Sequence, residues 1–194
     1  KWKQYRSALL KALSPLDQAI LKFHYEEGYA PECGYTNMGS QNKYDDCSKL
    51  YKSFIKNMNV IKVCDNNAYE NGCIPNYKGR DTILKEQGAS DEIVETAQKS
   101  CTGFTENNIK KASAFITQDG MIFFPYAVGM SYAPLIIVDV NGFKGPNKWG
   151  HDVYSLELTL NTDFTGSVAK SCYGGCCNTV EKGGITSYEL IYEQ

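Results

Sequence analysis

Apolar residues recur at three- and four-residue steps over the first 27 residues, the spacing of one helical face, while charged side chains fall elsewhere on the wheel. This pattern predicts a long amphipathic helix that ends at Gly28, with a kink or restart at Ser14-Pro15. Its apolar stripe consists of Trp2, Tyr5, Leu9, Leu13, Leu16, Ile20 and Phe23. A helix of this length must bury such a stripe, so we expect it to pack against another layer.

The next stretch is less regular. Residues 29–47 have the composition of a loop, a short helix is expected at about 47–59, and residues 60–79 read as irregular. Residues 91–99 are expected to add one or two helical turns.

After Cys101 the pattern becomes that of strands. Asp119-Gly120 between two apolar runs is typical of a hairpin turn, and Val153 to Leu160 alternates in the manner of a strand. The predicted strands are 113–117, 121–126, 135–140 and 153–160, with 185–192 as a last edge strand. The order of elements indicates an α+β fold, a long N-terminal helix packed on an antiparallel sheet. It divides the chain into 1–28 (the helix), 29–112 (a cysteine-containing connecting region) and 113–194 (the sheet and a cysteine-rich end).

Eight cysteines are too many for a reduced protein of this size, and no C-x-x-C pair supplies a zinc site. We therefore expect disulfides and an oxidising compartment, either the periplasm, the cell surface or the exterior. The cysteines are Cys33, Cys47, Cys64, Cys73, Cys101, Cys172, Cys176 and Cys177.

Spacing narrows the pairing without fixing it. Short separations favour Cys33–Cys47 and Cys64–Cys73. The adjacent residues Cys176 and Cys177 are expected to have different partners, one of them reaching back to Cys172 or Cys101.

Composition excludes several classes of protein. The 194 residues carry a net charge of −2, which gives no electrostatic case for nucleic acid, and no apolar run is long enough to cross a bilayer. Motifs for phosphate binding, dinucleotide binding and zinc proteolysis are absent, so no catalytic residue and no enzyme activity are predicted. The chain begins at Lys1 rather than Met, and we expect that a segment has been removed from its front.

The stretch Asp139-Val-Asn-Gly-Phe-Lys-Gly-Pro-Asn-Lys-Trp-Gly-His-Asp-Val-Tyr154 resembles a motif of bacterial prepilin-like proteins, the type IV pilins and type II secretion pseudopilins. In that family D-[VI]-N-G-x-K-G-P-N ends one strand, and G-x-D-[VIL]-[FY] enters the next. The order of helix, connecting loop, sheet and disulfide-bonded end is similar as well. The resemblance implies a filament subunit whose apolar N-terminal half-helix, absent here, sits in the inner membrane before assembly.

The loop between Asp139 and Asp152 has two interpretations. Its oxygen-bearing side chains, those of Asp139, Asn141, Asn147 and Asp152, are of the type that Ca²⁺ prefers, although the EF-hand spacing is not met. Alternatively, the glycines and asparagines form turns while both carboxylates accept backbone N–H bonds that close the loop. Calcium is the only cofactor considered, and the hydrogen-bonded alternative is preferred.

The sequence therefore predicts a structural subunit of an extracellular or periplasm-spanning filament, with other pilin subunits as partners and the residues from Trp2 to Phe23 as its assembly helix. The alternative is a secreted monomeric binding module, or adhesin, that uses tyrosine-rich loops. The fourteen tyrosines could equally be core and sheet residues. His24 is expected on the surface of the helix.

Overall fold

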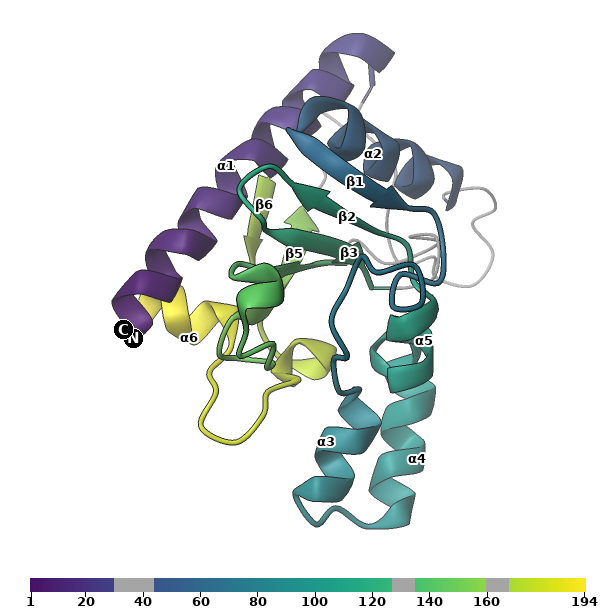
Figure 1. The fold of residues 1–194 in the computed structure, drawn as a ribbon, viewed down its shortest axis with the longest axis vertical. Helices are drawn as coiled ribbons and strands as arrows, with labels where there is room; N and C mark the ends of the chain where they lie inside the picture. The colour runs from purple at the N-terminus through teal and green to yellow at the C-terminus, as the bar shows by residue number, and fades with distance from the viewer. Residues whose placement is uncertain (30–43, 127–134, 160–167) are drawn as a thin grey trace.

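A six-stranded antiparallel sheet forms the centre of the molecule, and its strands lie in chain order from β1 to β6. The computed structural model describes residues 1–29, 44–126, 135–159 and 168–194. Figure 1 shows the long helix α1 running diagonally along the sheet, with the two chain ends side by side. The strands are β1 (Val60–Cys64), β2 (Ala114–Thr117), β3 (Ile122–Pro125), β4 (Leu135–Asp139), β5 (Val153–Thr159) and β6 (Val168–Ser171). The α-helices are α1 (Trp2–Glu27), α2 (Tyr44–Asn57), α3 (Arg80–Glu86), α4 (Asp91–Ser100), α5 (Glu106–Lys111) and α6 (Ser187–Tyr192).

The helix α1 is a single helix of 26 residues with Pro15 inside it, so the predicted restart at Pro15 is wrong. Proline lacks the N–H that would bond to the carbonyl of Lys11, yet Ala12, Leu16 and Ala19 are buried on both sides of the gap. Because these neighbours are buried, the parts of α1 before and after Pro15 both stay packed against the sheet. The helix ends as predicted at Gly28, whose positive φ of 76° suits glycine.

One face of the sheet packs against α1, α2 and α6. Residues of the sheet such as Phe123, Ile136 and Leu156 join Leu16 and Phe54 of the helices in one buried cluster. At the β6 edge of the sheet, the carboxylate of Asp17 in α1 accepts the N–H of Ala169 at 2.6 Å.

The other face is covered by the middle of the chain and by the cysteine-rich end. The short helices α3, α4 and α5 form a lobe below the sheet (Figure 1). A second buried cluster contains Tyr77, Phe104, Phe124 and Trp149, and the Trp149 indole N–H donates to the carbonyl of Lys78 at 2.8 Å. Because both faces are covered, Val153 and Ser155 are buried as well as Tyr154, which lies between them.

The α+β class, the N-terminal helix and the antiparallel sheet are as predicted. The hairpin around Asp119-Gly120 is confirmed as β2 and β3, and the strands predicted at 135–140 and 153–160 are confirmed as β4 and β5. The turns at 91–99 correspond to α4, and the helix expected at 47–59 is α2, which begins three residues earlier, at Tyr44.

Four parts of the prediction are wrong or incomplete. Residues 185–192 do not form an edge strand, because Thr186 and Glu189 make a reciprocal capping box that begins α6. Residues 60–64, taken as irregular, form β1, whose β-branched residues pair with β2. The strand β6 and the helices α3 and α5 were not foreseen. His24 is 6% exposed rather than on the surface, since it faces inward near the end of α1.

Candidate functional site

The loop from Asp139 to Asp152 joins β4 to β5 and contains a short 3-10 helix, Gly142–Lys144. Asp139 is the last residue of β4 and is fully buried. Its Oδ1 accepts the backbone N–H groups of Asn141 at 3.0 Å and Gly142 at 2.7 Å, and its Oδ2 accepts the hydroxyl of Tyr77 at 2.6 Å. The carboxylate thus fixes the start of the loop and ties it to a segment far away in sequence.

Asp152 closes the other end of the loop in the same way. It is fully buried, and its two oxygens accept the backbone N–H groups of Asn147 and Lys148, each at 2.9 Å. Each carboxylate therefore holds the backbone at its own end of the loop. This arrangement is the one that the hydrogen-bonded alternative predicts.

The two asparagines complete the loop. The side-chain amide of Asn141 donates to the carbonyl of Gly145. With its amide nitrogen turned inward, Asn147 donates to Asp139 Oδ2 at 3.2 Å and to the carbonyl of Gly142 at 2.7 Å. The positive φ of Gly142 and its close approach to the turn between β2 and β3 both require glycine, since a Cβ there would overlap the carbonyl oxygen of Gly120.

The structure brings the four candidate calcium ligands together, but their polar atoms serve the loop itself. All four carboxylate oxygens accept an N–H or O–H donor. Within the described ranges, no group of three or more His, Cys, Asp or Glu residues is placed to hold a metal ion. These hydrogen bonds are the ones expected of a closed loop, the preferred alternative. Calcium binding by the same residues stays the less favoured alternative.

Burial also shifts the acidity of this cluster. Loss of hydration raises the pKa of Asp139 to about 7, the Tyr77 hydrogen bond opposes this shift, and the nearby Asp152 adds to it. The pKa of Tyr77 is raised well above its usual value by burial and then by the charge of Asp139. The charge of Asp139 is therefore expected to change with pH near neutrality.

The predicted assembly helix is placed with its stripe inward. Leu9, Leu16, Ile20 and Phe23 are buried against the sheet, and the remaining members, Trp2, Tyr5 and Leu13, are half-buried at the same core. The opposite side of α1 carries apolar residues that sequence analysis did not single out. Leu10, Leu21 and Tyr25 are 39%, 57% and 90% exposed. Their spacing was visible in the sequence, but their exposure depends on which face the sheet occupies.

Three disulfides lie in the described part of the chain, and one of them links the cysteine-rich end to the middle. Cys64 pairs with Cys73, as the short spacing predicts, while Cys101 pairs with Cys176 and Cys172 with Cys177. Adjacent Cys176 and Cys177 thus have different partners, as expected. The predicted Cys33–Cys47 pair lies outside the described residues.

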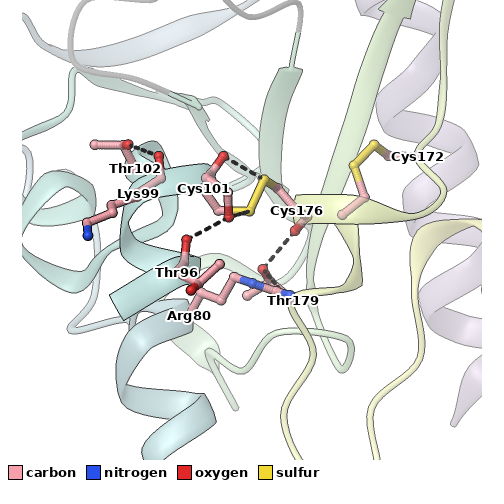
Figure 2. Close-up of a disulfide and its surroundings, with 10 residues drawn as sticks. Arg80, Thr96, Lys99, Cys101, Thr102, Cys172, Cys176 and Thr179 are labelled. Atoms are coloured by element: carbon pink, nitrogen blue, oxygen red, sulfur yellow. Dashed lines mark hydrogen bonds between the residues drawn. A yellow bond between two sulfur atoms is a disulfide. The ribbon is translucent and has the colours of Figure 1, made fainter. Parts of the chain in front are cut away.

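Figure 2 shows how the Cys101–Cys176 bridge is supported by its surroundings. The carbonyl of Cys176 accepts the hydroxyl of Thr179 at 2.7 Å, and that hydroxyl in turn accepts from the guanidinium of Arg80 at 3.2 Å. The bridge and this chain of hydrogen bonds join the C-terminal segment to the α3–α4 lobe.

The described tyrosines range from buried to exposed. Tyr51, Tyr77 and Tyr126 are buried, as the core alternative predicts. Tyr173 and Tyr192, by contrast, are 77% and 66% exposed. The rings of both residues contact the ring of Tyr188, so the three form an aromatic cluster at the surface.

His151 makes contacts of a structural kind. One ring nitrogen lies 2.9 Å from the Lys1 ammonium, and the other lies 3.1 Å from the carbonyl of Lys182.

No helix in the described part of the chain is long and apolar enough to span a membrane.

Comparisons of the chain with protein-family models, with curated proteins and with solved structures find no match. Function is therefore inferred from the residues and the geometry of the chain itself.

Proposed function

We propose that this chain is the globular part of a filament subunit of the type IV pilin or pseudopilin kind, acting by assembly and surface display rather than by catalysis. Its partners would be other pilin subunits, and its place a surface filament or the periplasm, with an inner-membrane anchor before assembly. The observation that carries the proposal is the two-sided character of α1. One side of this helix is buried on the sheet, and the other side presents apolar residues to the outside.

The exposed apolar residues of α1 fall on one stripe. Leu21 lies about three turns after Leu10, and Tyr25 lies about one turn after Leu21, so the three side chains point in similar directions. Scattered surface leucines need no explanation, but an aligned set on a long helix resembles the second face of a helix that packs in a bundle. A filament subunit needs such a face, because its helix contacts both its own sheet and neighbouring copies.

The motif between Asp139 and Tyr154 adds a second line of support. Its residues have clear structural roles here, since Asp139 and Asp152 close the loop and Gly142 allows its close approach to the β2–β3 turn. The motif that resembles prepilin-like proteins therefore forms the connection between β4 and β5. This agrees with the family pattern, in which the motif ends one strand and enters the next.

The disulfides suit a protein displayed outside the cell. The Cys172–Cys177 disulfide closes the loop that contains Tyr173. The Cys101–Cys176 disulfide ties the C-terminal segment to the end of α4. Such cross-links resist unfolding and proteolysis in an oxidising compartment.

The proposal is tested by producing the full-length gene product and examining the cells by electron microscopy. The coding sequence upstream of Lys1 should encode an apolar helical segment of roughly 25 residues after a prepilin-peptidase site. A cleaved secretory signal peptide at that position, with monomeric protein in the medium, would favour the secreted binding module instead.

A pair of matched variants sharpens the test. Leu21→Glu places a charge on the outer stripe of α1 and should abolish filaments without changing the melting temperature. Ile93→Glu makes the same change at a residue of α4 that is 54% exposed, and it should leave filaments intact. Equal filament yield from both variants would contradict the assigned role of the outer stripe.

A further inference from the structure

A hollow of about 570 Å³ lies where α1, the end of α2 and the turn between β2 and β3 meet. Its volume falls within the range of roughly 300–1,000 Å³ that is usual for small-molecule sites. The apolar residues at its base offer little surface to a ligand, because Met58, Met121 and Phe123 are 7%, 6% and 1% exposed. The surface that a ligand would meet is therefore mostly polar.

Side-chain amides dominate this polar surface, and we call the site the amide hollow. Four of its twelve lining residues carry an amide: Gln18, Asn57, Asn59 and Gln118. The side chains of Asn59 and Gln118 are exposed and make no hydrogen bond with the described part of the chain. The Gln18 amide donates only within α1, to the hydroxyl of Ser14 at 3.4 Å. These amides therefore retain donors and acceptors for a ligand.

Asn57, the last residue of α2, has an acceptor without a donor. Its amide nitrogen donates to the carbonyl oxygen of Ser53 at 2.9 Å and to the Ser53 hydroxyl at 3.0 Å. Its Oδ1 atom is buried and accepts no hydrogen bond from any residue in the described ranges. Buried acceptors in folded proteins are nearly always satisfied. Because Asn57 lines the amide hollow, a hydroxyl group bound there would supply the donor that Oδ1 lacks.

The charges of the amide hollow cancel. Lys11 and Asp119 are the two charged residues among those that line it, and the Lys11 ammonium lies 3.5 Å from the Asp119 carboxylate. The hollow thus offers no net charge to attract an ionic ligand. Its chemistry fits a neutral molecule that carries several groups able both to donate and to accept hydrogen bonds.

We propose that the amide hollow binds a neutral pyranose sugar, either free or as the end unit of a glycan. Each sugar hydroxyl both donates and accepts, and a side-chain amide offers an N–H donor and a carbonyl acceptor side by side. Apolar ligands lack this combination, and anionic ligands would add an uncompensated charge. The inference goes beyond the proposed function, because assembly into a filament does not require a sugar site.

The amide hollow lies on the flank of α1. At about 100° per residue, Lys11, Pro15 and Gln18 fall between the buried stripe of α1 and its outer stripe. Figure 1 shows the β2–β3 turn beside the middle of α1, where these residues lie. Sugar binding therefore uses a different part of the helix surface from the one assigned to filament contacts.

The test titrates the isotope-labelled 194-residue chain with glucose, galactose, mannose and N-acetylglucosamine, and follows the side-chain amide signals by NMR. At least one sugar should shift the signals of Asn57, Asn59 and Gln118 together and saturably, with a Kd of about 1 mM. Glucuronate, which adds a carboxylate to the same ring, should bind more weakly than glucose. The proposal is overturned if no neutral sugar shifts these signals at about 100 mM, or if glucuronate binds more tightly.

Matched variants locate the site. Asn59→Ala and Gln118→Ala each remove an exposed amide from the hollow without touching the core, and each should weaken sugar binding about tenfold. Gln4→Ala removes an exposed amide from α1 outside the hollow and should bind as tightly as the unaltered chain. Equal affinity of all three variants would contradict the assignment, and their melting temperatures verify that they fold.

A glycan array separates the two sources of the sugar. Signal on glycans that end in the bound sugar would identify a glycan end as the ligand, whereas a silent array beside a positive titration would identify the free sugar. Both measurements use the chain without filaments, so their outcome leaves the filament proposal to its own test.

Discussion

The two faces of the sheet are covered in different ways. On one face, a single helix of 26 residues buries a periodic stripe, and α2 and α6 complete the layer. On the other face, helices of 7, 10 and 6 residues and several loops pack around Trp149, and disulfides join them. Helices this short are marginal without tertiary support. The layer on the first face is therefore stabilised by a periodic apolar stripe. The layer on the second face is stabilised by disulfides and by the packing of aromatic side chains.

The largest loss of stability should come from removing the disulfide that spans the most residues. Cys101 and Cys176 are separated by 75 residues, so the Cys101→Ala/Cys176→Ala variant should lose about 4 kcal/mol of unfolding free energy. Chemical denaturation measures this loss. As a control, Cys172→Ala/Cys177→Ala opens a link across only 5 residues and should cost about 2 kcal/mol. An equal cost for the two variants would show that chain entropy is not the source of the stabilisation.

The second largest effect should come from a substitution that creates a cavity between α1 and the sheet. Leu16 is fully buried, and Leu16→Ala should cost about 3 kcal/mol through lost burial and the space left behind. Leu21→Ala, on the outer side of the same helix, should change the free energy of the isolated domain by less than about 0.5 kcal/mol. Urea denaturation of both variants tests this difference. A similar loss from the two would mean that α1 does not pack on the sheet in the orientation described.

The Asp139 loop should make stability depend on pH. The folded chain holds the Asp139 proton up to a pKa of about 7, whereas an unfolded aspartic acid loses it near 3.9. The folded state therefore binds more protons between these values, and its stability should rise as the pH falls from 8 to 5, by about 2 kcal/mol. Asp139→Asn should remove this increment. A pH profile that is the same for both proteins would contradict the assignment to Asp139.

Calcium should have the smallest effect. Because both carboxylates accept the loop's own N–H groups, we expect equal melting temperatures in EDTA and in millimolar calcium. A rise of several degrees with calcium would correspond to roughly 2–3 kcal/mol of binding linkage and would make Asp139, Asn141, Asn147 and Asp152 metal ligands.

Much of the α1 side could be predicted from sequence, because one long segment carries its own periodic pattern. The stripe from Leu9 to Phe23 reflects burial of one helical face, and the alternation after Val153 correctly indicated a strand although both of its faces are covered. The edge strand predicted at 185–192 failed because a capping box, a local hydrogen-bond pattern, outweighed the strand-like composition. The β1 strand was missed because its partner, β2, lies 50 to 57 residues further along the chain.

The candidate site was only partly predictable for a similar reason. The residue types at Asp139 and Asp152 and the hydrogen-bonded closure were visible in the local sequence. The hydroxyl of Tyr77, which completes the Asp139 site, comes from a segment 62 residues away. The aromatic cluster at the surface likewise combines a disulfide-closed loop with α6, and no sequence spacing placed Tyr173 against Tyr188.

The most direct measurement of the central claim is a helical reconstruction of filaments formed by the full-length protein, by electron cryo-microscopy. The account predicts α1 along the filament axis, with Leu10, Leu21 and Tyr25 against neighbouring helices and the disulfide-linked segments outside. Filaments in which this stripe faces solvent, or a full-length protein that remains a secreted monomer, would contradict it.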